Sequence, residues 1–204
     1  MDKKNEKSGL AKIAPLYNRF YKNLYWLLIP VLLSDIMTSD AMVRWVPGLY
    51  LPGMLLGILC PVCYYVVLLR NSLRENLYRI AGIVGIGSVV LGIAAAFVKG
   101  PITVLCSGGS IACGILVEYF EYKGHKITVS QVDRILADRW FKLFYLYFGL
   151  FLLTFVGAFI APSVAVVGVI TAYISMGGMF VLQVIKMIYL SNSAAAFGNA
   201  TLRP

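Results

Sequence analysis

Residues 143–185, LFYLYFGLFLLTFVGAFIAPSVAVVGVITAYISMGGMFVLQVI, form the longest run of the sequence without Asp, Glu, Lys or Arg. A helix needs about 20 apolar residues to cross the roughly 30 Å hydrocarbon core of a bilayer. The run is therefore long enough for two spans. Ala161, Pro162 and Ser163, near its middle, are typical of a turn. The sequence predicts two antiparallel membrane-spanning helices in this stretch.

The composition of the whole chain agrees with this prediction. Hydrophobic residues make up 60% of the 204 residues and charged residues only 13%, and the mean hydropathy is +0.81. A water-soluble domain of this size would have to expose large apolar patches. We therefore expect an all-α, polytopic integral membrane protein that is covered by lipid.

Three shorter runs without charged residues each predict one further span: residues 45–69, 80–98 and 101–117. The first span is less clean, because the apolar run 24–33 follows aromatic residues mixed with Arg and Lys, as at a membrane surface. We place this span at about residues 20–40. The expected architecture is six transmembrane helices paired as three hairpins.

The basic residues fall on alternate sides of these spans. All lysines and arginines except Arg44 and Lys99 lie in four segments: residues 1–22, 70–79, 118–142 and 186–204. Because positively charged loops stay in the cytoplasm, both termini are expected on the cytoplasmic side of the cell membrane. The net charge of +9 then predicts contact with anionic headgroups of the inner leaflet and no nucleic-acid partner.

The chain is expected to be a single membrane domain, residues 1–204. A basic cytoplasmic segment, 1–19, precedes the six-helix bundle of residues 20–190, and a cytoplasmic tail, 191–204, follows it. We expect the partners to be lipid and either another membrane protein or a second copy of the chain.

The segment 118–142 is the longest expected loop. Ser130 and Asp133 resemble a helix-capping box, which predicts a short helix before the fifth span. Its apolar residues share one face: Val132, Ile135, Leu136 and Trp140. This pattern is typical of an amphipathic helix that lies on the inner leaflet or on a partner protein.

Asp35 is the strongest candidate for a ligand-binding residue. It shares a helix face with Thr38 and Ser39, and a carboxylate within a span usually faces a cavity or a partner. The alternative is that the first helix ends early and Asp35 lies at the outer membrane surface. Lys99 and Gln183 are weaker binding candidates. Prolines 30, 52 and 61 and Gly177-Gly178 interrupt three spans, as in many solute carriers.

Other polar residues are expected in water. We place Glu118 and Glu121 at the wetted inner end of the fourth span and His125, the only histidine, in the loop that follows.

The CPVC motif contains Cys60 and Cys63 at about mid-membrane, and Cys113 reaches a similar depth. These thiols are expected to be inert packing residues, because no cation or helix N-terminus lies near them. A redox pair is the alternative. A metal site is not expected, since the only histidine is far away, and no cofactor is predicted.

Small residues form a stripe on the third span: Ala81, Gly85, Ser88, Gly92 and Ala95. A matching set lies on the fourth: Cys106, Gly109, Ser110, Cys113 and Gly114. Small residues let two helices approach closely in lipid, so these spans are predicted to pack as an antiparallel pair.

The sequence contains no catalytic or nucleotide-binding motif, so an enzyme is not expected. Our first interpretation is a protein that binds or moves a small solute or ion, alone or as a subunit of a transporter. A thiol–disulfide oxidoreductase that uses Cys60 and Cys63 is the second. A non-catalytic scaffold or partner subunit is the third.

Overall fold

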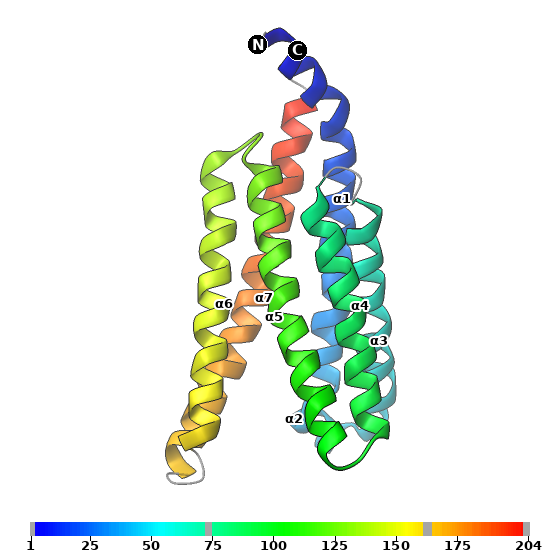
Figure 1. Ribbon diagram of the computed structural model, residues 1–204, viewed down its shortest axis with the longest axis vertical. Coiled ribbons are helices and arrows are strands. Elements are labelled where there is room, and N and C mark those ends of the chain that lie inside the picture. Colours follow the sequence, from blue (N-terminus) through cyan, green and yellow to red (C-terminus); the bar gives the residue numbers. More distant parts are fainter. Residues whose placement is uncertain (1–2, 72–74, 161–164, 202–204) are drawn as a thin grey trace.

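The computed structural model describes residues 3–71, 75–160 and 165–201, which fold into helices without any strand (Figure 1). In chain order the elements are α1 (Lys3–Met37), α2 (Asp40–Trp45), the 3-10 helix η1 (Pro47–Leu49), α3 (Tyr50–Arg70), α4 (Asn76–Phe97), α5 (Pro101–Val129), α6 (Arg134–Ile160) and α7 (Ala165–Thr201).

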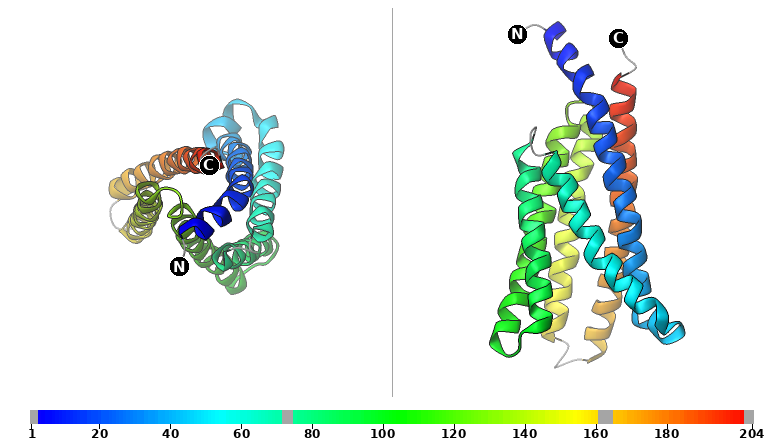
Figure 2. Two further views of the ribbon diagram at one scale, coloured as in Figure 1. Left: turned by 90° about the horizontal axis from the view of Figure 1, so that it is seen from above. Right: turned by 90° about the vertical axis from the view of Figure 1, so that its right-hand side faces the viewer.

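The long helices form a ring in chain order (Figure 2). Each long helix packs on the next along the chain, and α1 also packs on α7. We call the end of the ring where α1 begins and α7 ends the terminal end. The opposite end, with α2 and the α4–α5 connection, is called the far end. Neighbouring long helices along the chain run antiparallel (Figure 1).

Among the described residues, five helices are long and apolar enough to cross a membrane: Pro47–Arg70, Asn76–Phe97, Pro101–Val129, Arg134–Gly157 and Val166–Ala200. The prediction of an all-helical chain suited to a multi-pass membrane protein is therefore confirmed. The expected first span, residues 20–40, lies mostly in α1, which is not among these five. The charged residues before residue 24 lower the hydropathy of α1.

Residues 118–142 differ from the expected loop. α5 continues to Val129, and α6 begins at Arg134, so a separate amphipathic helix is not formed in this described segment. Asp133, and not Ser130, caps the new helix, because its carboxylate accepts a hydrogen bond from the Leu136 amide at 2.9 Å. Leu136 and Trp140 are buried in the bundle, whereas Ile135 is 71% exposed. Residues of the segment 118–142 therefore extend α5 and begin α6, where they pack against neighbouring helices.

The predicted pairing of the 80–98 and 101–117 segments is confirmed. α4 and α5 pack closely, and Ser88 and Ser110 each donate a hydrogen bond to the other's backbone carbonyl, at 3.0 and 2.9 Å. Gly92 lies against Ser110 in the same contact. Gly85 has another role, because it accommodates the ring of Tyr65 on α3.

The buried side chains gather in the half of the ring near the terminal end. The largest fully buried ones there are Trp140, Tyr21, Tyr78, Tyr122 and Phe197. Toward the far end α6 and α7 diverge from α3, α4 and α5 (Figure 1), and large apolar side chains such as Phe97, Val104 and Tyr173 are exposed. The largest buried side chains are therefore concentrated in one half of the molecule.

Candidate functional site

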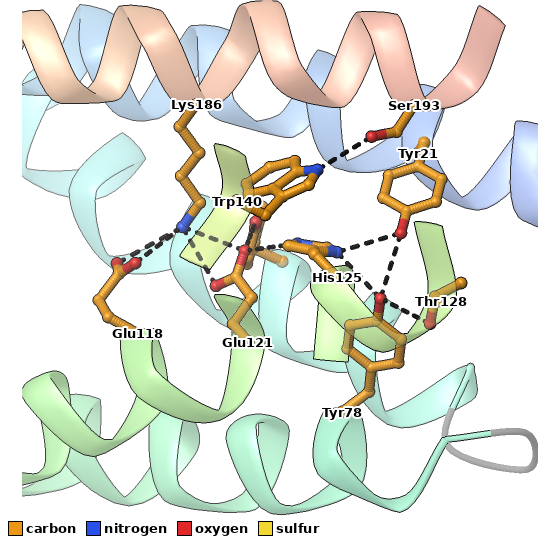
Figure 3. Close-up of polar contacts among 10 residues, drawn as sticks. Tyr21, Tyr78, Glu118, Glu121, His125, Thr128, Trp140, Lys186 and Ser193 are labelled. Atoms are coloured by element: carbon orange, nitrogen blue, oxygen red, sulfur yellow. Dashed lines mark hydrogen bonds and ion pairs between the residues drawn. The ribbon is translucent and has the colours of Figure 1, made fainter. Parts of the chain in front are cut away.

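Three polar residues of α5 point into the ring near the terminal end (Figure 3). Glu118, Glu121 and His125 are spaced three and four residues apart, so they share one helix face. Glu121 is 1% exposed and His125 is 0% exposed. The expectation that Glu118 and Glu121 lie in water and His125 in a loop is therefore wrong. α5 continues past Val117, and the other helices cover this face.

Lys186 of α7 neutralises part of the acidic charge. Its ammonium lies 3.1 Å from a carboxylate oxygen of Glu118 and 3.1 Å from the carboxylate of Glu121. It also lies over the rings of Tyr64 and Tyr122, at 5.3 and 5.2 Å from their centroids. The lysine side chain is 4% exposed, so three charged groups meet away from bulk water.

The side chain of Glu121 accepts hydrogen bonds from three partners. Tyr64 donates its hydroxyl proton to Oε1, and Lys186 contacts the same carboxylate. His125 Nε2 lies 3.2 Å from Oε1, which places the imidazole proton on Nε2. Three donors compensate a buried carboxylate well, so Glu121 is held as the fixed, ionised acid of the pair.

His125 connects the acids to a group of aromatic hydroxyls. Its Nδ1 lies 2.9 Å from the Tyr78 hydroxyl and 3.3 Å from that of Tyr21, which leaves it as an acceptor. Tyr78 also lies 3.3 Å from the Thr128 hydroxyl. The network therefore joins side chains of α1, α3, α4, α5 and α7.

Trp140 adds the remaining long helix, α6. Its ring centroid lies 4.3 Å from that of His125. Its indole N–H donates a hydrogen bond to Ser193 of α7 at 3.1 Å. Side chains of α1, α4, α5 and α6 thus contact the imidazole, and side chains of α3 and α7 contact Glu121 and Trp140 beside it.

A cavity of about 100 Å³ adjoins the acids. It is lined by Leu28 and Val31 of α1, Pro61, Tyr64 and Tyr65 of α3, Glu118 and Glu121 of α5, and Gln183 and Lys186 of α7. A water molecule occupies about 30 Å³ in the liquid, so this space suits a few waters or one small ion. Carboxylate, amide and hydroxyl oxygens on its wall are ligands for a hard cation.

The charges of the cluster do not balance by themselves. Two ionised carboxylates and one ammonium, with neutral His125, leave one excess negative charge. An uncompensated charge is costly in a low-dielectric interior. The cluster is therefore neutral when it holds either one proton or one small monovalent cation. Glu118 is the acid suited to this exchange, because its side chain is 16% exposed and borders the cavity.

The binding residues predicted from sequence are separated in the structure. Gln183 lines the cavity, as does the helix-interrupting Pro61. Asp35 is exposed toward the far end of α1. The hydroxyls of Thr38 and Ser39 donate to the backbone carbonyls of Ser34 and Ile36, which completes the helix end.

The other candidates also lie away from the cluster. Lys99 is exposed in the α4–α5 connection. Cys60, Cys63, Cys106 and Cys113 are free thiols, and Cys63 is exposed. Within residues 3–71, 75–160 and 165–201, His, Cys, Asp and Glu side chains do not gather into a group of three that could hold a metal.

No family model matches the sequence, and no curated protein or solved structure is significantly similar to it. The function is therefore inferred from the buried cluster and its cavity.

Proposed function

We propose that the protein is a six-span protein of the cell membrane that binds a small cation at Glu118 and carries it across the bilayer. The single observation that supports this function most is the pair of buried carboxylates that share one lysine beside a cavity. Residues of one chain line this cavity, so the proposed site needs no partner subunit.

The proposed topology includes α1 as the sixth span. α1 packs on both α3 and α7 and runs along the ring like the five apolar helices (Figure 1). The terminal end, where most basic residues lie, is then cytoplasmic. Glu118 lies about 25 Å along α5 from Pro101, at 1.5 Å per residue. The acids would therefore sit in the cytoplasmic half of the bilayer.

The chemistry of the proposed step is an exchange. In the empty state the cluster consists of protonated Glu118, ionised Glu121 and the Lys186 ammonium, with no net charge. A monovalent cation enters the cavity, Glu118 releases its proton to solution, and the cluster remains neutral. The two carboxylates on the cavity wall favour a cation, such as an inorganic monovalent ion or a small amine. The ring faces of Tyr64 and Tyr65 add favourable contacts for a cation.

The test is tracer uptake by the full chain reconstituted in liposomes, with sodium, rubidium and methylammonium supplied separately. We expect saturable uptake of at least one of them. Glu118→Gln should lower this uptake about tenfold or more, since one charged contact is worth at least 1.4 kcal/mol. Uptake should also acidify the medium in proportion to the cation taken up.

Asp35→Asn is the matched control, because it removes an exposed acid outside the cavity. We expect this variant to retain uptake within about twofold, the scale of a surface substitution. Size-exclusion chromatography in detergent establishes that each variant is folded. Loss of uptake in Asp35→Asn together with full uptake in Glu118→Gln would contradict the proposal, as would a wild-type chain that moves none of the cations.

A further inference from the structure

A second cavity, of about 160 Å³, lies between α1 and α3 at the terminal end; it is open to the surface, and Arg19 and Arg70 in its wall are exposed. Its lining from α1 is Leu16, Arg19, Phe20 and Asn23, and its lining from α3 and the residue after it is Val67, Arg70 and Asn71. None of these residues borders the acidic cavity. The two cavities therefore differ in position and in the charge of their walls.

The polar groups of the second cavity include two guanidinium groups and two side-chain amides, and none of its lining residues is acidic. Among the described residues, neither Arg19 nor Arg70 forms a salt bridge. Guanidinium groups bind phosphate oxygens through paired, charge-assisted hydrogen bonds. The charge and the donors of this wall favour an anion.

Asn71 supplies an independent observation. Its Nδ2 is buried and has no hydrogen-bond partner. A buried donor without an acceptor destabilises the fold, and a ligand oxygen would satisfy it. The Asn71 backbone is fixed in place, because its amide caps α3 by bonding to the carbonyls of Val67 and Leu68. The orphan donor therefore belongs to the residue that caps α3, next to Arg70 in the cavity wall.

The remaining lining residues are apolar. Phe20 is buried, and Leu16 and Val67 flank the polar groups. Cationic donors beside apolar side chains at the end of a membrane helix suit a phosphate group attached to an apolar chain.

We propose that this cavity binds an anionic phosphate ester, through Arg19, Arg70 and the amide of Asn71. The phosphate is carried either by an anionic phospholipid of the bilayer or by a soluble ester. This site acts independently of cation binding at Glu118, so either proposal can fail while the other stands.

The test uses the full chain in detergent and the double variant Arg19→Gln/Arg70→Gln. Native mass spectrometry measures retained phosphatidylglycerol, and calorimetric titration measures glycerol phosphate. We expect the wild type to bind one of these probes and the double variant to bind it about tenfold or more weakly. Retention of phosphatidylglycerol alone identifies a lipid site, and saturable binding of glycerol phosphate identifies a soluble ligand.

The matched control is Arg134→Gln/Arg139→Gln, which removes two exposed charges from the start of α6 outside this cavity. It should bind the probe as the wild type does. Asn71→Leu tests the orphan donor separately, because it keeps a side chain of similar size and removes the amide N–H without adding a charge; it should bind the probe more weakly than the wild type. Equal binding by the wild type and the Arg19/Arg70 variant, absence of binding to both probes, or equal loss in the control pair would overturn the proposal.

Discussion

The two halves of the ring differ in the contacts that hold their helices together. Near the terminal end, polar and aromatic side chains from all six long helices meet around Glu121 and His125 (Figure 3). Toward the far end α6 and α7 diverge from the other helices, and the contacts there include the Ser88–Ser110 pair and exposed apolar residues. The half near the terminal end is held by buried ion pairs and aromatic hydroxyls, whereas the far half combines hydrogen bonds such as the Ser88–Ser110 pair with small residues and exposed apolar side chains.

This difference suggests how a carrier would use the fold. Directional hydrogen bonds and ion pairs have few alternative geometries, so the half near the terminal end should remain rigid. At the far end α6 and α7 diverge from α3, α4 and α5, so these two groups of helices can shift relative to each other at lower cost. We therefore expect access to the Glu118 cavity to change mainly through motion at the far end.

Among the variants that test the difference between the two halves, Lys186→Met is expected to lower the free energy of unfolding most. The substitution removes the only lysine that contacts Glu118 and Glu121 among the described residues. Breaking a buried ion pair on one side costs about 3–5 kcal/mol. We expect a lower free energy of unfolding, measured by denaturant titration in detergent.

Two further variants sharpen this measurement. Lys186→Met/Glu118→Gln removes one of the unpaired acids and should recover part of the loss. Lys99→Met changes an exposed lysine near the far end and should lie within about 0.5 kcal/mol of the wild type. Full stability of Lys186→Met would show that the three charges do not hold the helices together.

A smaller effect is expected from Ser88→Ala in the far half. This change removes one of the two reciprocal hydrogen bonds between α4 and α5 and keeps the small side chain. Hydrogen bonds between membrane helices average about 0.6 kcal/mol, so the unfolding free energy should fall by about that amount. Ser107→Ala is the control, as it changes a serine of α5 outside this pair. If Ser88→Ala lowered the free energy of unfolding as much as Lys186→Met, the two halves would not differ in how strongly their contacts stabilise the fold.

Cys60→Ser/Cys63→Ser is expected to change stability and cation uptake least. These free thiols do not line the acidic cavity, so stability and cation uptake should stay near wild-type values. Thiol trapping in intact membranes tests the redox alternative directly. A pair that cycles between thiol and disulfide in cells would favour the oxidoreductase interpretation.

Helices and helix pairs that depend on the spacing of nearby residues were predictable from the sequence. Uncharged runs located the apolar helices, and the stripe of small residues identified the α4–α5 pair. The end of α5 was missed because charged residues stop the apolar run at Val117, although the helix continues to Val129. The spacing of Glu118, Glu121 and His125 on one helix face was a signal that could have located half of the site.

The other half of the site depends on which helices become neighbours. Lys186 lies 65 positions after Glu121 in the sequence, and only the closure of the ring brings them together. The alternation of apolar and charged segments does not specify that pairing. Asp35 was predicted to bind a ligand because it is an acid within the expected span 20–40, and the structure places it on an exposed surface.

The separation of Glu121 and Lys186 also has a consequence for biosynthesis. Ribosomes add about 5–20 residues per second, so the lysine is made about 3–13 s after the acid that it contacts. During this interval the nascent α5 has two carboxylates without their cationic partner. We expect α5 to stay in a hydrated or protein-lined environment, such as the insertion machinery, until α7 has entered the bilayer.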